Sequence, residues 1–370
     1  MTTPDIIDVD SLLVPFEGDN PAGVDIREDS SPQSIYYKIK DARSAARASE
    51  RRLLAEEDPD AANTVVPEWD TVIDLAPQIL TDNGKDLEVA AWYTEALLRE
   101  HGFPGLRDGF RLLRGLVEGF WDNLYPMPDE DGIETRVAPL TGLNGEEGEG
   151  TLIVPINKVL ITQGHTYSPY ATWHYQQAYD LDRITDPEKR EARIADGAIT
   201  MKMIEQSVLE TAQQFFTETR EDLSGCAEEF SKLSAALDEK CGTDSPPTSN
   251  IRNALNRVME VINFIAPEQA AEEGGDSEEA GAQSSGPSAA KPRGGGAIKN
   301  REDAYRSMLT VAKFFRETEP HSPVSYMLEK AVRLGRMSLP EILAELITDE
   351  NARYEYFRLT GITPPEQEGY

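Results

Sequence analysis

Apolar residues recur at helical spacing through most of this chain. One face of residues 86–100 collects Leu87, Ala90, Ala91, Thr94, Leu97 and Leu98. Residues 69–80, 106–124 and 249–265 repeat the pattern. An apolar stripe with a period of 3.6 residues makes a helix face that must be buried. The pattern therefore predicts a mainly α protein in which amphipathic helices pack against one another.

Other stretches weaken or interrupt this pattern. Residues 34–57 predict a polar helix with alternating charge. The apolar runs 151–154 and 159–162 are compatible with two short strands or with extended links between domains, because short apolar runs fit either structure. Residues 187–237 return to a helical pattern, and we expect the helix to break near 217–221.

Residues 298–370 contain a compact helical pattern of their own. Asn300 can cap a first helix, because its side chain can accept hydrogen bonds from free backbone N–H groups. Pro323 suits the first position of a second helix, where a missing N–H costs nothing, and Gly335 ends it. A third helix is predicted from Ser338. These features indicate a small helical C-terminal module.

Composition divides the chain before that module. Residues 267–297 are rich in Glu, Gly, Ser, Ala and Pro, and such a segment cannot bury enough apolar surface to offset its ordering entropy. We expect it to be a flexible acidic and glycine-rich linker. The predicted organisation is an N-terminal helical domain at 1–144, a mostly helical middle region at 145–266, the linker, and the C-terminal module at 298–370.

The charge is unevenly distributed. The chain has 36 Lys and Arg against 67 Asp and Glu, a net charge of −31. Residues 299–370 carry 10 basic and 12 acidic residues, so nearly all of the net charge falls on the remainder. Such a surface repels phosphate backbones and anionic lipid. We therefore expect no nucleic-acid partner and no membrane-surface binding.

The sequence also argues against membrane insertion and export. No apolar run approaches the ~20 residues of a spanning helix. Residues 1–14 are acidic and lack the basic and apolar regions of a secretory signal. We expect a cytoplasmic protein without direct membrane insertion, in which Cys226 and Cys241 are reduced and share one helical stretch or its end.

Motifs for catalysis or cofactor binding are missing from the sequence. It contains neither a Gly-x-x-x-x-Gly-Lys-Ser/Thr loop nor a Gly-x-Ser-x-Gly elbow. The four histidines are scattered: His101, His165, His174 and His321. None pairs with a cysteine at zinc-ligand spacing. We predict no catalytic residue, no cofactor and no metal site, and we interpret His321 as a loop histidine rather than a pH sensor.

Four stretches resemble one known family. The first three are PFEGDNPAGVDIRED at 15–29, WDTVIDLAPQIL at 69–80 and KDLEVAAWYTEALLREHGFPGLRDGFRLLRGLVEGFWDNLYP at 85–126. The fourth is REDAYRSMLTVAKFFRETEPHSPVSYMLEKAVRLGRMSLPEIL at 301–343. In this order they resemble the TssA (ImpA-like) family of bacterial type VI secretion, in its shorter form. The resemblance makes residues 1–144 an ImpA-like N-terminal domain.

The resemblance implies a non-enzymatic, cytoplasmic assembly component. In this family the C-terminal domain forms rings, and the protein contacts baseplate, sheath, tube or membrane-complex proteins. A module of this size buries little surface alone, so association with copies of itself would stabilise it. The acidic N-terminal bodies would then repel one another and present many copies to a symmetric partner.

We place the oligomer interface on the two helices of the C-terminal module. The residues predicted to form it are Tyr305, Met308, Phe314, Phe315, Val324, Met327, Leu328 and Leu334. Neighbouring residues on a helix point about 100° apart, so one of Phe314 and Phe315 can face the module while the other faces a neighbour. We expect Phe314 to be the outward one.

Two other functions are compatible with the composition. A monomeric helical adaptor or chaperone could use the acidic body to shield a basic client protein. An acid-using hydrolase is a third possibility, although nothing in the sequence brings a nucleophile, a base and oxyanion donors together.

Overall fold

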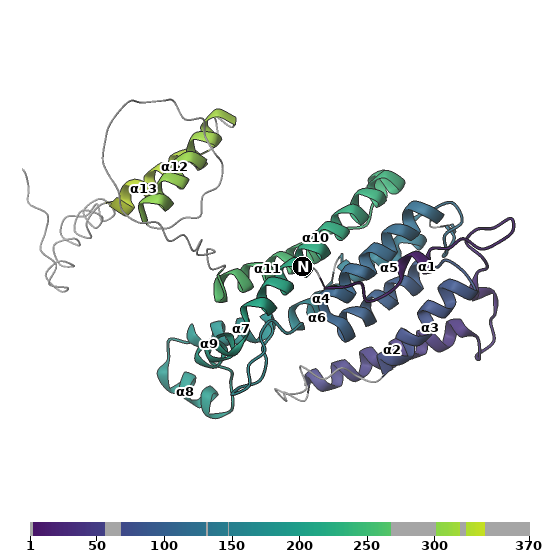
Figure 1. The fold of residues 1–370 in the computed structure, drawn as a ribbon, viewed down its shortest axis with the longest axis horizontal. Coiled ribbons are helices and arrows are strands. Elements are labelled where there is room, and N and C mark those ends of the chain that lie inside the picture. The colour runs from purple at the N-terminus through teal and green to yellow at the C-terminus, as the bar shows by residue number, and fades with distance from the viewer. Residues whose placement is uncertain are drawn as a thin grey trace, which may run out of the picture. The chain divides into compact units, whose positions relative to one another are not determined.

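The computed structural model describes residues 3–55, 68–130, 132–146, 148–267, 301–318 and 323–336. Every named element within these residues is a helix, which confirms the mainly α prediction. The chain divides into two compact units, residues 1–273 and residues 274–370. Figure 1 shows the helices of both units.

The first unit is called the helical body below, and its described residues form thirteen named helical elements. They are α1 (Val9–Leu12), η1 (Ile26–Glu28), α2 (Ile35–Ala55), α3 (Glu68–Asp82), α4 (Leu87–Phe120), α5 (Glu134–Asn144), α6 (Ile153–Lys158), α7 (Thr172–Asp182), α8 (Pro187–Ala195), α9 (Met201–Glu210), α10 (Gln213–Cys241), η3 (Gly242–Asp244) and α11 (Ser249–Ile265). The second unit holds α12 (Arg301–Thr318) and α13 (Val324–Arg336).

Helix α4 is the centre of the helical body. The Asp86 side chain caps it by accepting hydrogen bonds from the backbone N–H groups of Glu88, at 2.9 Å, and Val89, at 3.1 Å. At Gly102 the backbone leaves helical geometry, with φ of +62°, and Pro104 follows without an N–H to donate. The two halves of α4 correspond to the predicted helices at 86–100 and 106–124.

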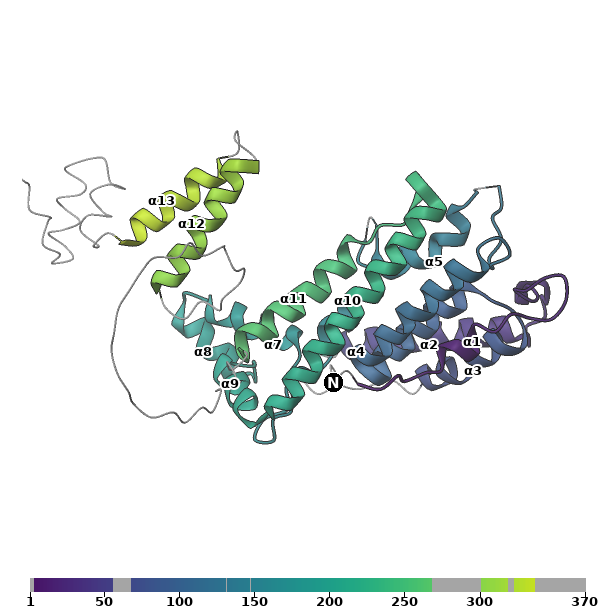
Figure 2. The same cartoon turned by 45° about the horizontal axis from the view of Figure 1, so that its top comes forward.

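The apolar faces of α3, α4 and α10 form one core. Helix α10 runs along α4, and α11 packs along α10 (Figure 2). The Phe110 ring on α4 lies 4.9 Å from the Phe230 ring on α10, measured between centroids. Cys226 is buried between the same helices, with its thiol 3.0 Å from the Phe103 carbonyl oxygen. Cys241 is half-buried and closes α10, so both cysteines lie on one helix as predicted.

A smaller cluster of apolar side chains joins α7 and α9. Tyr170, Ala178 and Ile204 are its buried members. His174 lies beside them, 3% exposed, and its Nδ1 accepts a hydrogen bond from the Ala171 N–H at 2.9 Å. This part of the helical body therefore has a core of its own.

Residues 151–154 form neither the short strand nor the extended link that the sequence allowed. Residues 153–158 form α6, because Leu152 and Ile156, four residues apart, are both fully buried on one side of a helical turn. The 159–162 run is an extended link, which was the other predicted possibility. The Ile161 and Thr162 N–H groups both donate to the Tyr170 carbonyl oxygen, but only one isolated bridge forms.

The predicted break near 217–221 was also wrong. Helix α10 continues through this stretch, and the chain turns earlier, at Thr211 and Ala212. Polar residues in this stretch form side-chain hydrogen bonds that leave the helix intact. The Thr219 hydroxyl donates to the Phe215 carbonyl oxygen at 2.7 Å, and Arg220 donates to Asn263 on α11 at 2.9 Å.

The second unit pairs α12 with α13, and this pair is called the α12–α13 hairpin below. Ala312 and Val332 are buried between the helices. Arg316 makes an ion pair with Glu329 at 2.8 Å, and its guanidinium carbon lies 5.0 Å from the centre of the Tyr326 ring. The predicted linker at 267–297, His321 and the third helix expected from Ser338 lie outside the described residues, apart from the first residue of that linker.

Candidate functional site

The α12–α13 hairpin carries all eight residues predicted for the oligomer interface. Four are exposed: Met308, Phe314, Val324 and Met327. Four are half-buried: Tyr305, Phe315, Leu328 and Leu334. The exposed residues come from both helices, so apolar side chains of α12 and of α13 are both accessible to solvent.

Phe314 is the outward phenylalanine, as the helix geometry predicts. Its side chain is 60% exposed, whereas Phe315 is half-buried, and the two rings lie 5.8 Å apart in an edge-to-face arrangement. On α13, Met327 is 68% exposed. Aromatic and methionine side chains are enriched in protein interfaces, so this surface is suited to contact with another protein. The role of these residues as an interface stays a prediction.

The structure adds Tyr326 and Val311 to this surface. Tyr326 is 60% exposed and lies beside Met327, with the Arg316 guanidinium over its ring. Tyr326 lies within the helix predicted to form the interface but was not one of the eight named residues, because it does not belong to the apolar stripe of that helix. The sequence does place two large side chains, Tyr326 and Met327, next to each other, and this pair could have indicated an exposed apolar surface.

The helical body instead presents charge, and a row of ion pairs joins η1 and α2 to the N-terminal half of α4. The guanidinium of Arg27 binds Asp86 at 2.5 Å and Glu88 at 2.6 Å. Farther along, Arg43 donates to both carboxylate oxygens of the fully buried Glu95, at 2.9 and 2.8 Å. Burial alone raises the pKa of the Glu95 carboxyl, but the bonds from Arg43 hold it below its ordinary value.

The next ion pair along this seam is Glu50 with Arg99. Their closest atoms are 2.5 Å apart, and the indole N–H of Trp69 donates to the same Glu50 carboxylate at 2.8 Å. The Arg99 guanidinium carbon also lies 4.3 Å from the centre of the Trp69 ring. These contacts hold three side chains from three helices in fixed positions.

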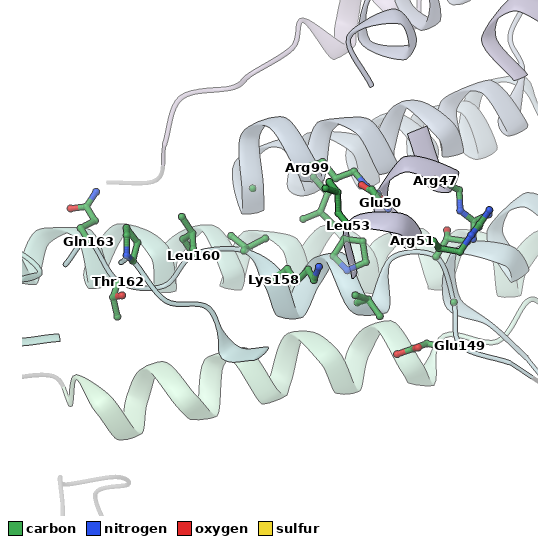
Figure 3. A pocket seen from close by; sticks show the side chains of 18 of the residues that line it. Arg47, Glu50, Arg51, Leu53, Arg99, Glu149, Lys158, Leu160, Thr162 and Gln163 are labelled. Atoms are coloured by element: carbon green, nitrogen blue, oxygen red, sulfur yellow. Dashed lines mark hydrogen bonds and ion pairs between the residues drawn. The ribbon is translucent and has the colours of Figure 1, made fainter. Parts of the chain in front are cut away.

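A cavity of about 950 Å³ opens beside this ion pair (Figure 3). Residues of α2, α4, α6 and the 159–165 link line it, together with Phe215 at the start of α10. Three cations, Arg47, Arg51 and Lys158, lie in its wall, and no ion pair joins any of them to another described residue. Burial lowers the pKa of Arg47; the nearby Glu95 carboxylate raises it, and Arg43, Arg51 and Arg99 lower it further.

Sequence analysis missed this cavity, although part of its signal was present. Helix α2 carries six Lys and Arg against one Asp and one Glu, in a chain with a net charge of −31. We predicted alternating charge for this helix and did not count its excess of Lys and Arg over Asp and Glu. The contributions of Lys158 and Phe215 could not be foreseen, because those residues lie more than 100 positions away from α2.

No arrangement suited to metal binding is found in the described part of the chain: no group of three or more His, Cys, Asp or Glu side chains is placed to hold an ion there. Among the described helices, none is long and apolar enough to cross a bilayer.

Comparison with known proteins places the chain in one system. The ImpA N-terminal family of the type VI secretion system matches residues 13–145. The chain is 26% identical over 364 residues to the type VI secretion system component TssA1 of Pseudomonas aeruginosa. That match spans 95% of this chain and 98% of the relative.

A solved structure agrees with this result. It is the N-terminal domain, including the conserved ImpA N-terminal region, of the TssA component of the type VI secretion system from Burkholderia cenocepacia. The two folds superpose with a TM-score of 0.58 at 26% identity, over 70% of this chain and 93% of that one. The family match over residues 13–145, the near full-length relative and the shared fold together support a TssA-family protein of the type VI secretion system.

Proposed function

We propose that this TssA-family chain is a non-enzymatic assembly component that forms a ring-like oligomer through its C-terminal module. In this proposal the oligomer contacts the baseplate, sheath or tube of the secretion machine and helps them to assemble. The observation that carries it is the exposed apolar surface of the α12–α13 hairpin, in which Phe314 is 60% and Met327 68% exposed. The relative's description as a type VI secretion component supports the same role.

The physical argument for association rests on what two helices can bury. A hairpin of this size encloses only a thin core, with Ala312 and Val332 at its centre. Its remaining large apolar side chains gain free energy when a second copy covers them, at roughly 25 cal/mol for each Å² removed from water. The unit has few net charges, so copies can approach closely, while the acidic bodies remain apart.

The test is the mass of the full-length protein by multi-angle light scattering, compared with Phe314→Asp. We expect Phe314→Asp to lower the oligomer mass, because a carboxylate buried without a partner carries a large desolvation cost. Phe314→Leu is the matched control, since it keeps an apolar group at the same position and should keep the mass. Circular dichroism checks that helicity is unchanged in both.

An unchanged mass for Phe314→Asp would contradict the assigned interface. A wild-type protein that remains monomeric at every concentration would overturn the ring. In that case the monomeric acidic adaptor for a basic client becomes the better proposal.

A further inference from the structure

The cavity beside Glu50 and Arg99 differs in charge from the rest of the helical body. Its charged lining comprises Arg47, Arg51, Arg99 and Lys158 against Glu50 and Glu149. Arg99 and Glu50 neutralise each other through their ion pair, and Arg51 and Glu149 are both exposed at one end of the cavity. The named lining therefore carries two positive charges in excess around a concave surface, on a chain whose net charge is −31. A basic cavity on so acidic a protein selects strongly for acidic ligands.

The three cations come from two separate elements and have no ion-pair partner among the described residues. Arg47 and Arg51 are one turn apart on α2, so they lie on the same helix face. Lys158 ends α6. Arg47 and Lys158 are both half-buried, and burial lowers the pKa of the Lys158 ammonium. Removing cations from water without a partner costs free energy, and an anionic ligand offsets that cost.

The walls of the cavity are held in place before any ligand arrives. On one side, Glu50 is fixed by Arg99 and Trp69. On the other side, backbone N–H groups of the 159–165 link and of the next residue donate hydrogen bonds. Gln163 donates to Thr211 at 2.7 Å, and His165 and Thr166 donate to Glu210 at 2.6 and 2.9 Å. A pre-formed site loses little conformational entropy on binding.

The lining is apolar as well as basic. Half-buried or buried apolar side chains complete it: Leu53, Leu98, Val154, Val159, Leu160 and Phe215. Figure 3 shows Gln163 and Thr162 at one end, Lys158 near the middle, and Arg47 and Arg51 toward the other end. The cavity is therefore elongated, and cations occur at separate points along it.

We propose that this cavity binds an acidic peptide segment of another protein, with carboxylates at Arg47, Arg51 and Lys158 and apolar side chains against Leu160 and Phe215. A volume of about 950 Å³ is near the upper end of small-ligand sites and accommodates several residues of extended chain. A simple inorganic anion would engage the cations but leave the apolar lining uncovered. Every residue that lines the cavity belongs to the helical body.

The test uses the full-length protein and a fluorescein-labelled peptide in which glutamate and leucine alternate, followed by fluorescence anisotropy. We expect saturable binding that weakens as NaCl is raised. We expect no binding of the same peptide with glutamine in place of glutamate. Arg47→Gln/Arg51→Gln should weaken binding about tenfold, and Lys158→Gln about threefold, because each removes a partner of a carboxylate.

The matched control is Lys38→Gln/Arg52→Gln. It removes the same charge from the same helix at exposed positions that do not line the cavity. Binding to this variant should stay within about twofold of wild type. Circular dichroism confirms that every variant is folded.

Three outcomes would overturn the proposal. The wild-type protein could fail to bind the glutamate peptide. The Lys38→Gln/Arg52→Gln control could weaken binding as much as Arg47→Gln/Arg51→Gln, which would mean that general charge attraction holds the peptide. Inorganic phosphate could displace the peptide fully at an ionic strength where NaCl does not, which would make the cavity a site for small anions.

Discussion

The helical body and the α12–α13 hairpin place their large apolar side chains in opposite ways. In the body, Phe110, Trp69 and Phe216 are completely buried between helices. In the hairpin, Phe314, Tyr326 and Met327 are each at least 60% exposed. The difference follows from the number of layers: α4 is covered by α3 and by α10, whereas α12 packs on α13. Among the described residues, the body therefore encloses its large apolar side chains, while the hairpin leaves several of them exposed.

The two units also differ in how they use charge. The body places ion pairs at helix contacts, with Glu95 fully buried under Arg43. In the described part of the hairpin, the pair Arg316–Glu329 is almost half exposed on both sides. An exposed pair contributes little to stability, whereas leaving a buried charge unpaired is costly. Charge therefore fixes helix positions in the body more firmly than in the hairpin.

The largest expected effect comes from Phe110→Ala, at the contact between α4 and α10. The ring is fully buried and lies 4.9 Å from Phe230, so its removal leaves a cavity that rigid helices cannot close. We expect a loss of about 3–5 kcal/mol in the free energy of unfolding. Urea unfolding followed by circular dichroism measures it. A loss below about 1 kcal/mol would show that the α4–α10 contact is not the centre of the core.

An intermediate effect is expected from acid at His174. Burial, followed by the nearby Lys158, lowers the pKa of His174 from 6.5 to about 4. The unfolded chain takes up a proton as the pH falls through 6.5, whereas the folded protein does so only near 4. The His174 contribution to stability is therefore complete above pH 6.5 and is lost between 6.5 and 4, by about 3 kcal/mol.

The measurement is the difference in urea midpoint between wild type and His174→Gln at each pH. Wild type should lose more stability than the variant between pH 6.5 and 4. His101→Gln, at an exposed histidine, is the control and should follow wild type. Parallel curves for wild type and His174→Gln would mean that His174 is accessible to solvent and that the α7–α9 cluster is looser than the α4–α10 core.

The smallest effect on unfolding is expected from Met327→Ala. The side chain is 68% exposed, so its removal should change the unfolding free energy of the dissociated chain by less than about 0.5 kcal/mol. The oligomer mass should fall even so, because the same side chain is available to a second copy. Light scattering and urea unfolding of one sample at low and high concentration separate the two. A large loss of stability in the dissociated chain would place Met327 in the core of its own module.

Helix positions were predictable where the apolar stripe was long. Residues 249–265 coincide with α11, and Phe314 points outward as the geometry of consecutive helical residues requires. Neither alternative for 151–154, strand or extended link, was right, because so short an apolar run does not distinguish these structures from a helical turn. The break at 217–221 was wrong because the partners of Arg220 lie on α11, more than forty residues away.

The sequence by itself determined the helical class, the unequal distribution of charge and the resemblance to the TssA family. Each depends on local spacing or on composition, which the chain carries whatever its fold. Only the tertiary structure decided that α6 is a helix, that α10 is continuous, and that Arg47, Arg51 and Lys158 face one cavity. These depend on contacts between residues far apart in the chain, and such contacts leave no periodic signal in either partner.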